Sequence, residues 1–455
     1  MTRQTRSERY EVNGSMLPRI VRPAAATALV ASCVLAGTSA TARVPAAPAA
    51  KPFAGQTITV AYASTPPPKR LLDQFKAQTG ITVNWTNVGW DSLQTKITAA
   101  AMAHAYFADV ADVDWSRVGQ YYRLKWFQPL NTYVDVAALK RDVPQLGSFI
   151  ANGTLVGMPA DSSFTVTTIN MRDLRTAGVG TVPRTFAQYA ADLKRLQSTH
   201  VVASPLDIPF SAAEGLSTYW YQMTAAFGGT MLDRSFHPLF TSPSSAGYRA
   251  LAWMVDAYKS GLVPKANINM IDTQGMQSEM ALGRVASIFS DYSGNVGSLY
   301  NVPGASKVIG DIQYIPTPGV NGPAPNLGNP DGLGIPMGAH NPGAGAAFIR
   351  WFTDPTNQAR WAGLEGGKSV IVGFPLPMRL SAFRLLTKAG KLDQGSLLTD
   401  LLARHAQAAF PYGIPPWYTR FSAAVNTNIH SAAIGSESVP AAISAIASTV
   451  NALTS

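Results

Sequence analysis

The sequence predicts an α/β fold with parallel strands, because short apolar runs alternate with helical patterns in residues 58–114. Gly80 follows the first helical pattern and Asp91 begins the second, which matches the residue preferences at helix ends. Connections of this length suit parallel pairing, since parallel strands require crossover segments. We expect strands at 58–62, 81–88 and 110–114, and helices at 66–79 and 91–104.

The same alternation continues to the end of the chain. Alternating Thr and apolar residues predict a strand at 164–170, and four large side chains share one face of a helix at 185–198. Gly228 and Gly229 end an aromatic-rich helix at 219–227. We further expect strands at 285–289 and 308–316, and helices at 171–178, 244–260, 273–282, 342–353, 356–365 and within 431–455.

Residues 1–51 have the composition of an export signal rather than of a folded segment. Arg19 and Arg22 precede an apolar run at 24–37, which is shorter than the about 20 residues that span a bilayer. Ala40-Thr41-Ala42 fits ordinary secretory cleavage, so we expect a signal peptide at 1–42 and a linker at 43–56.

A lipoprotein signal is the alternative interpretation of the same leader. Val30-Ala31-Ser32-Cys33 fits a lipobox, and Cys33 is the only cysteine in the chain. Lipidation at Cys33 would anchor the mature protein at a membrane. Met16 is an alternative start of the chain.

Charge and cysteine content exclude several classes of protein. Residues 1–52 hold seven basic and two acidic residues, so +5 of the formal net charge of +10 belongs to the leader. The remaining +5 is spread over some 400 residues without a basic cluster, which argues against nucleic-acid binding. A single cysteine excludes a disulfide framework, and the length suggests two domains.

The sequence offers no catalytic motif beyond the leader. His-Glu-x-x-His, Gly-x-Ser-x-Gly and Ser-x-x-Lys are absent there, and the six histidines lack metal-ligand spacing. Asp112 and Asp114 are too close in sequence for a glycosidase pair, whose carboxyl groups normally come from different elements. We therefore expect no enzyme activity, no cofactor and no metal site.

Seven short segments carry a family resemblance, in order, from about residue 57 to the end. They are Leu72–Val83, Phe107–Val110, Leu155–Pro159 with Thr168–Asn170, Phe227–Gly229, Met280–Ala286, Ile315–Gly319, and Ala347–Thr353 with Gln358. Together they resemble the family 1 extracellular solute-binding proteins of bacterial ABC importers, the maltodextrin-binding-protein-like group. Ile169 and Ser287 depart from the family pattern, which has Tyr and Met at these positions.

The resemblance implies a two-lobe periplasmic-binding-protein-like fold with a hinge of three crossover segments. It implies an N-lobe formed by 57–159 and 274–317, and a C-lobe formed by 166–267 and 333–455. The hinge segments would be 160–165, 268–273 and 318–332.

The resemblance also implies a function. The chain would be an exported, periplasmic and monomeric protein that captures a sugar or polyol in an aromatic cleft by hinge closure. It would deliver this small-molecule ligand to ABC permease subunits in the inner membrane. A carrier for a polyamine or for Fe(III), for which Tyr121-Tyr122 is a weak signal, and a chemosensory ligand-presenting protein are the alternatives.

Aromatic and polar residues at the ends of predicted elements are the candidate ligand contacts. Aromatic rings suit the apolar face of a sugar, and Asp, Asn and Arg suit its hydroxyl groups. Residues 112–117 and 291–295 follow strands, where open α/β sheets bind ligands. The candidates are Trp90, Asp114, Trp115, Arg117, Ser163, Trp220, Asp291, Tyr292, Asp331 and Trp417. The other tryptophans are interpreted as packing residues: Trp85, Trp126, Trp253, Trp351 and Trp361.

Overall fold

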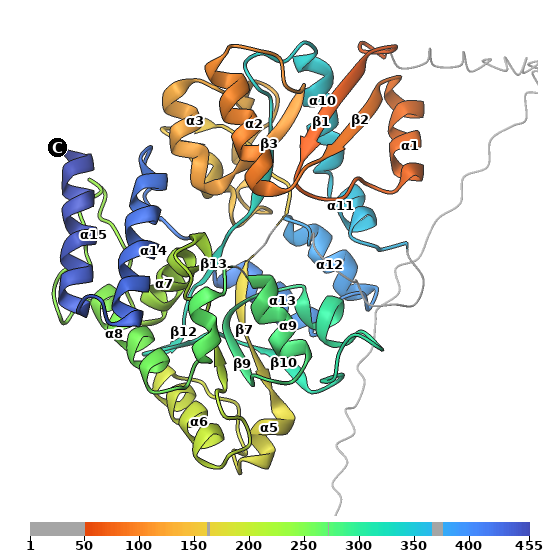
Figure 1. Cartoon of the computed structure of the whole chain (residues 1–455). Coiled ribbons are helices and arrows are strands. Elements are labelled where there is room, and N and C mark those ends of the chain that lie inside the picture. Colours follow the sequence, from red (N-terminus) through yellow and green to blue (C-terminus); the bar gives the residue numbers. More distant parts are fainter. Residues whose placement is uncertain (1–50, 162–163, 272, 366–375) are drawn as a thin grey trace, which may run out of the picture. The chain divides into compact units, whose positions relative to one another are not determined.

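The computed structural model describes residues 51–455 apart from 162–163, 272 and 366–375 (Figure 1). The predicted signal peptide 1–42 with Cys33, and most of the predicted linker 43–56, lie outside the described residues. So does the candidate contact Ser163.

The first sheet is built mainly from the N-terminal part of the chain. Its strand order is β2-β1-β3-β14-β6. β1, β2 and β3 are parallel as predicted, whereas β14 runs antiparallel to both β3 and β6. The strands are β1 (Thr57–Tyr62), β2 (Thr82–Asn87), β3 (Val110–Asp114), β6 (Met158–Pro159) and β14 (Asp331–Gly334).

Helices with apolar faces cover this sheet (Figure 1). Phe75 of α1 is fully buried, and its ring lies 5.5 Å from Phe348 and 4.9 Å from Trp351 of α10. Gly80 ends α1 with φ +76°, and a Cβ there would lie 2.7 Å from Ala54, so this turn requires glycine. The helices are α1 (Lys69–Thr79), α2 (Trp90–Met102), α3 (Val118–Leu124), α4 (Val136–Leu139), α10 (Pro342–Phe352) and α11 (Pro355–Trp361).

The second sheet has the strand order β10-β7-β9-β8. Its central strand β7 is buried at every position and pairs antiparallel with β9 and β10, whereas β8 pairs parallel with β9. The strands are β7 (Thr165–Asn170), β8 (Leu206–Asp207), β9 (Ser287–Tyr292) and β10 (Ile312–Ile315).

The sheet pairing corrects two parts of the predicted lobe assignment. Residues 274–317 were expected in the first lobe, but β9 and β10 lie in the second sheet, and 268–273 therefore connects strands of one sheet. Conversely, β14 and α10, at the start of the predicted segment 333–455, belong to the first sheet. Local apolar patterns identify strands but contain no information about which distant strand each one pairs with.

The helices beside the second sheet bury the faces that the sequence predicts. Phe186, Tyr189, Leu193 and Leu196 of α6 are all buried, and Thr185 with Gln188 forms a capping box. α14 and α15 pack on each other and on α8, and α14 also packs on α7 (Figure 1). The helices are α5 (Met171–Thr176), α6 (Phe186–Ser198), α7 (Glu214–Ala226), α8 (Ala246–Lys259), α9 (Thr273–Ala281), α12 (Leu380–Lys388), α13 (Gly395–Arg404), α14 (Tyr418–Ile434) and α15 (Val439–Thr454).

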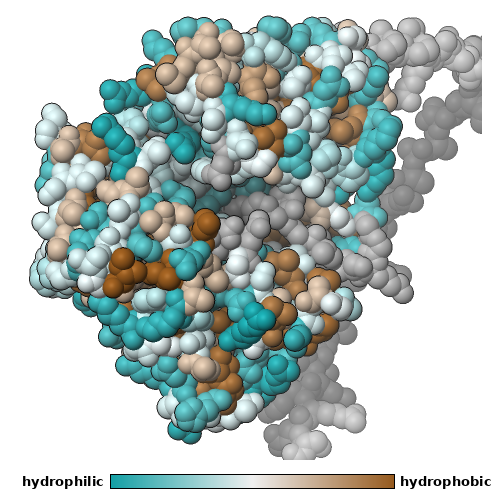
Figure 2. All heavy atoms as spheres, in the orientation of Figure 1, coloured by the Kyte–Doolittle hydropathy of each residue, from teal (hydrophilic) through white to brown (hydrophobic). Residues whose placement is uncertain are grey.

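Short two-stranded pairs complete the described secondary structure. They are β4 (Ile150–Ala151) with β5 (Thr154–Leu155), β11 (Pro318–Gly319) with β12 (Gly322–Pro323), and β13 (Asn326–Gly328) with β15 (Ala406–Ala408). The face shown in Figure 2 carries hydrophilic residues with small apolar groups interspersed among them. Within the described part of the chain, no helix has the length and apolar character needed to cross a bilayer.

Asp207, at the end of β8, gives the second sheet a pH-dependent stability. It is fully buried, Asn267 Nδ2 donates to its Oδ1, and burial raises its pKa to about 7. In the unfolded chain the pKa of an aspartate is about 3.9. Between about pH 4 and pH 7 the native state therefore keeps a proton on Asp207 that the unfolded chain has lost. Stability from this group is therefore fully present below about pH 4 and is lost as the pH rises through about 7.

We expect the Asp207→Asn variant to flatten this dependence. Between pH 4 and pH 8 the wild-type free energy of unfolding should fall by about 2–4 kcal/mol more than that of the variant. Urea unfolding at both pH values measures the difference. The control is Asp192→Asn on α6, a half-buried carboxyl whose pKa burial raises to a smaller extent. Parallel pH profiles for wild type and Asp207→Asn would contradict this account.

Candidate ligand-binding site

Four carboxyl groups come together where β3 ends and β14 begins. In the strand register, Asp331 of β14 lies opposite Asp114 of β3, and Asp112 lies two residues earlier on β3. Asp161 joins them from the segment after β6, because the Asp331 N–H donates to Asp161 Oδ1 at 3.3 Å. Tyr62 OH of β1 donates to Asp161 Oδ2 at 3.0 Å. We refer to Asp112, Asp114, Asp161 and Asp331 as the carboxyl cluster.

Burial and mutual repulsion disfavour negative charge in this cluster. Asp112, Asp114 and Asp161 are 0%, 5% and 1% exposed. Burial raises the pKa of Asp112 and of Asp331 well above the usual range, and the neighbouring carboxylates add to the effect. Burial also raises the pKa of Asp114, although hydrogen bonds from Ser116 and the charge of Arg117 oppose it. Burial and the neighbouring carboxylates therefore favour the protonated forms of Asp112 and Asp331.

An indole and a guanidinium group border the cluster. Trp90 Nε1, at the start of α2, donates to Asp114 Oδ2 at 3.2 Å. Asp114 caps the 3₁₀ turn Trp115–Arg117, because its Oδ1 accepts from the Ser116 N–H at 2.8 Å. This turn directs Arg117 over the Trp90 ring, with 5.8 Å between the guanidinium carbon and the ring centroid. Asp114, Arg117 and Trp90 thus form one connected group.

Residues beside the second sheet face this group. Arg117 Nη1 donates to Thr419 Oγ1 of α14 at 3.0 Å, and the Trp115 ring meets the Tyr418 ring edge-on at 5.4 Å. Glu214, the first residue of α7, accepts from Tyr418 OH and from Ser422 Oγ. Burial raises the pKa of Glu214, Asp114 raises it further, and Arg117 lowers it. Donors and acceptors on elements of both sheets therefore converge here.

The structure brings five of the predicted contacts together: Trp90, Asp114, Trp115, Arg117 and Asp331. It also adds residues that the sequence analysis did not select as contacts: Asp112, Asp161, Glu214, Tyr418 and Thr419. The sequence singles out Glu214 in one respect, because acidic residues are favourable in the first turn of a helix. That preference concerns helix stability and does not predict ligand binding.

Two predicted contacts, Trp220 and Asp291, are buried by packing and hydrogen bonds within the protein. Trp220 is 0% exposed, and its Nε1 donates to the Gly247 carbonyl at 2.9 Å in the α7–α8 core. Asp291 is buried, and Thr168 and Tyr300 hydroxyl groups each donate to its Oδ2 at 2.7 Å. A ligand contact for Trp220 or for Asp291 stays a prediction.

Trp417 directly precedes Tyr418, and Tyr292 directly follows Asp291. Trp417 is 8% exposed and packs edge-on against Phe236 at 5.9 Å and Phe421 at 6.2 Å, which makes it mainly a packing residue. Tyr292 ends β9, is half-buried and pairs with Thr165 across the sheet. A ligand contact for either residue stays a prediction.

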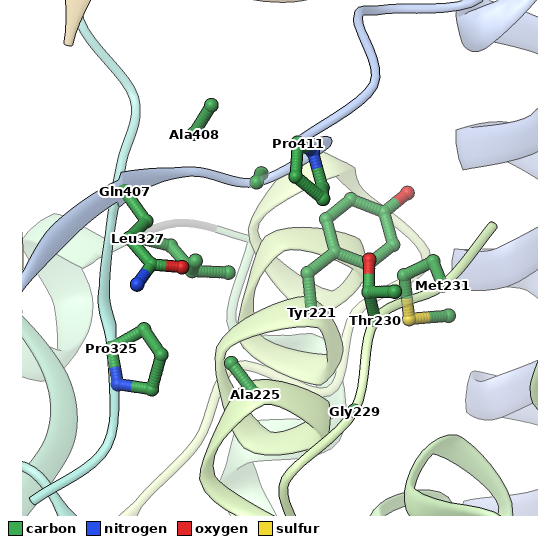
Figure 3. Close-up of a pocket in the computed structure, with 11 residues that line it drawn as sticks. Tyr221, Ala225, Gly229, Thr230, Met231, Pro325, Leu327, Gln407, Ala408 and Pro411 are labelled. Carbon is green, nitrogen blue, oxygen red and sulfur yellow. The ribbon is translucent and has the colours of Figure 1, made fainter. Parts of the chain in front are cut away.

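A separate pocket lies between α7 and the β13–β15 pair (Figure 3). Tyr221 and Ala225 of α7 line one side, and Leu327 and Gln407 line the other. Its volume of about 50 Å³ admits a few water molecules, whereas sites for drug-sized ligands measure about 300–1,000 Å³. This pocket is too small for a sugar, so the region around Asp114 and Arg117 is the stronger candidate site.

Comparison with known proteins decides the family. A sequence model of the family described as bacterial extracellular solute-binding protein matches residues 62–359. The chain belongs to this family. The match confirms the resemblance found in the seven segments, and with it solute binding as the family's role. No curated protein sequence matches the chain significantly.

Solved structures confirm the fold of this solute-binding protein. One is an ABC transporter solute-binding protein from Agrobacterium radiobacter K84 in complex with ribitol. It is 20% identical to this chain with a TM-score of 0.73, and the match covers 88% of this chain and 100% of that protein. One from Thermotoga lettingae, bound with α-D-tagatose, is 19% identical with a TM-score of 0.72, covering 88% and 100%. One from Agrobacterium vitis S4, with bound D-mannitol, is 17% identical with a TM-score of 0.70, covering 87% and 98%.

Proposed function

We propose that this solute-binding protein captures a sugar or polyol for an ABC importer and releases it unchanged to permease subunits in the inner membrane. The observation that carries the proposal is the convergence of Asp114, Arg117 and Glu214 beside the Trp90 ring. Carboxylate and guanidinium groups pair with hydroxyl groups, and the indole suits the apolar face of a sugar ring. The ligands of the three similar structures, ribitol, tagatose and mannitol, are of this class.

Hinge closure is the proposed mechanism. The Arg117–Thr419 hydrogen bond joins the turn after β3 to α14, so elements of both sheets meet at the site. A ligand enters when these contacts separate. It favours the closed state to the extent that it contacts both sides at once.

The remaining parts of the proposal follow from the family. An extracellular solute-binding protein acts outside the cytoplasm, and we propose a periplasmic monomer that carries out no catalysis. Among the described residues, no group of three or more His, Cys, Asp or Glu side chains suits a metal ion, which favours a sugar over Fe(III). Anchoring through Cys33 stays the alternative to a free periplasmic form.

A thermal-shift panel tests the proposed function. Ribitol, mannitol, tagatose and maltose are compared with spermidine and Fe(III) citrate. A specific ligand at one hundred times its dissociation constant stabilises the native state by about 2.7 kcal/mol, which raises the melting temperature by several degrees. We expect at least one polyhydroxylated solute to give this shift. A shift with Fe(III) alone, or with no solute of the hydroxylated class, would reject the proposal.

A further inference from the structure

The turn after β3 packs directly against the segment that leads from β15 into α14. Trp115, in this turn, is 3% exposed, and its ring stacks on Phe410 at 6.3 Å and meets Tyr418 edge-on at 5.4 Å. Two residues further along, Arg117 Nη1 donates to Thr419 Oγ1 at 3.0 Å. β3 belongs to the first sheet, whereas α14 packs on helices beside the second sheet, so these contacts join the two lobes of the fold.

Gly119 is a point of especially close approach between the two sides. It is the second residue of α3, and its φ is not positive, so its own backbone conformation does not require glycine. A Cβ at this position would lie 2.1 Å from the Ile414 carbonyl oxygen and 3.1 Å from the Pro415 carbonyl carbon. Both atoms belong to the main chain, which cannot turn aside as the end of a flexible side chain can. The close approach of the other lobe is therefore what excludes a side chain here.

These contacts are made by protein atoms on both sides. At Gly119 not even a methyl group fits between α3 and the Ile414 carbonyl, and the Trp115 ring is almost completely covered. Ser116 and Val118, in the same turn and at the start of α3, are buried as well. No ligand can lie between the lobes at these points. The contact therefore contributes to closure separately from whatever a solute contributes through its own contacts.

We propose that residues 115–119 and 410–419 form a latch, which is a direct contact that favours the closed arrangement of the two lobes. Gly119 is the positioning residue of this latch, because its missing side chain permits the approach. The latch raises the fraction of the protein that is competent to bind and thereby raises the affinity for the solute. This inference rests on the proposed function, to whose hinge closure it adds a contact that no ligand makes.

Spin-label distances test the latch without any ligand. In the full chain with Cys33→Ser, which removes the only native cysteine, Arg123→Cys on α3 and Thr427→Cys on α14 place labels at exposed positions on the two sides. We expect Gly119→Ala to shift the distance distribution to longer values, because the Cβ keeps α3 away from Ile414. Alanine suits a helix at least as well as glycine does, so the variant should fold. An unchanged distribution would overturn the inference, independently of whether any solute binds.

The affinity for a solute measures the same latch. The apparent dissociation constant rises by the factor by which the binding-competent fraction falls. With the best solute of the thermal-shift panel, we expect Gly119→Ala to weaken binding about tenfold or more in isothermal titration. Undiminished affinity would overturn the inference while the proposed function stands. If no solute of the panel binds the wild type, the proposed function is rejected, and the distance measurement still decides whether the latch exists.

Two further variants keep this experiment decisive. Gly147→Ala is the matched control, because a Cβ at that exposed glycine meets no atom within 4 Å, and it should keep the wild-type distances and affinity. If Gly119→Ala fails to fold, Thr419→Val takes its place, since this position is exposed and the change removes the acceptor for Arg117. We expect Thr419→Val to lengthen the distances to a smaller extent. Unchanged distances in that folded variant would likewise overturn the latch.

Discussion

Replacing Trp220 with alanine is expected to lower the free energy of unfolding by about 3–5 kcal/mol. The indole is fully buried, its ring lies 5.2 Å from Phe240, and its Nε1 donates to the Gly247 carbonyl. The substitution leaves a large cavity in the α7–α8 core and an acceptor without its donor. Urea unfolding followed by circular dichroism measures the loss.

Trp220→Phe is the matched control, since it keeps most of the ring volume and removes the Nε1 donor. We expect it to lose less stability than Trp220→Ala does. The competing view, that Trp220 faces a ligand, predicts the reverse pattern for Trp220→Ala: nearly unchanged stability together with much weaker binding. That pattern would contradict the packing role.

Replacing Arg117 with alanine is expected to weaken ligand binding about a hundredfold, which corresponds to about 3 kcal/mol. The guanidinium group lies over the Trp90 ring, its charge lowers the pKa of Asp114 and of Glu214 against the effect of burial, and it donates to Thr419. Its loss removes donors to ligand hydroxyl groups and the link between the turn after β3 and α14. Isothermal titration with the best ligand of the thermal-shift panel measures the change.

Two variants sharpen this experiment. Arg117→Lys keeps the positive charge without the planar fork, and we expect it to recover only part of the affinity. Arg350→Ala removes an exposed arginine of α10 that donates to the Tyr133 carbonyl, and it should bind as the wild type does. Wild-type affinity in Arg117→Ala would show that the ligand lies elsewhere.

The sequence predicts the first sheet well because its signals are local. The pattern from β1 to β3 combines apolar periodicity with Gly80 at a helix end, and both features act within a few residues. The pairing of β9 and β10 with β7 depends on residues more than 100 positions apart, and no local pattern encodes it. Gly435, with φ +82°, divides the C-terminal helical region into α14 and α15.

The candidate site is predictable where it follows strand ends. Asp114 and Arg117 were found because residues at the carboxyl end of β3 extend into the site. Trp220 was selected for the dense rings of its helix, but α7 is buried at every position from Tyr219 to Ala226, a pattern that is typical of a core helix. Glu214 joins the site only through the packing of α14 on α7, a tertiary contact without a local signal.

A crystal structure with the best ligand bound tests the central claim most directly. The account predicts ligand density that contacts Asp114, Arg117 and Glu214, with elements of both sheets enclosing it. Ligand density in the pocket beside Tyr221 and Leu327 of Figure 3, with the Asp114–Arg117 region unoccupied, would contradict it.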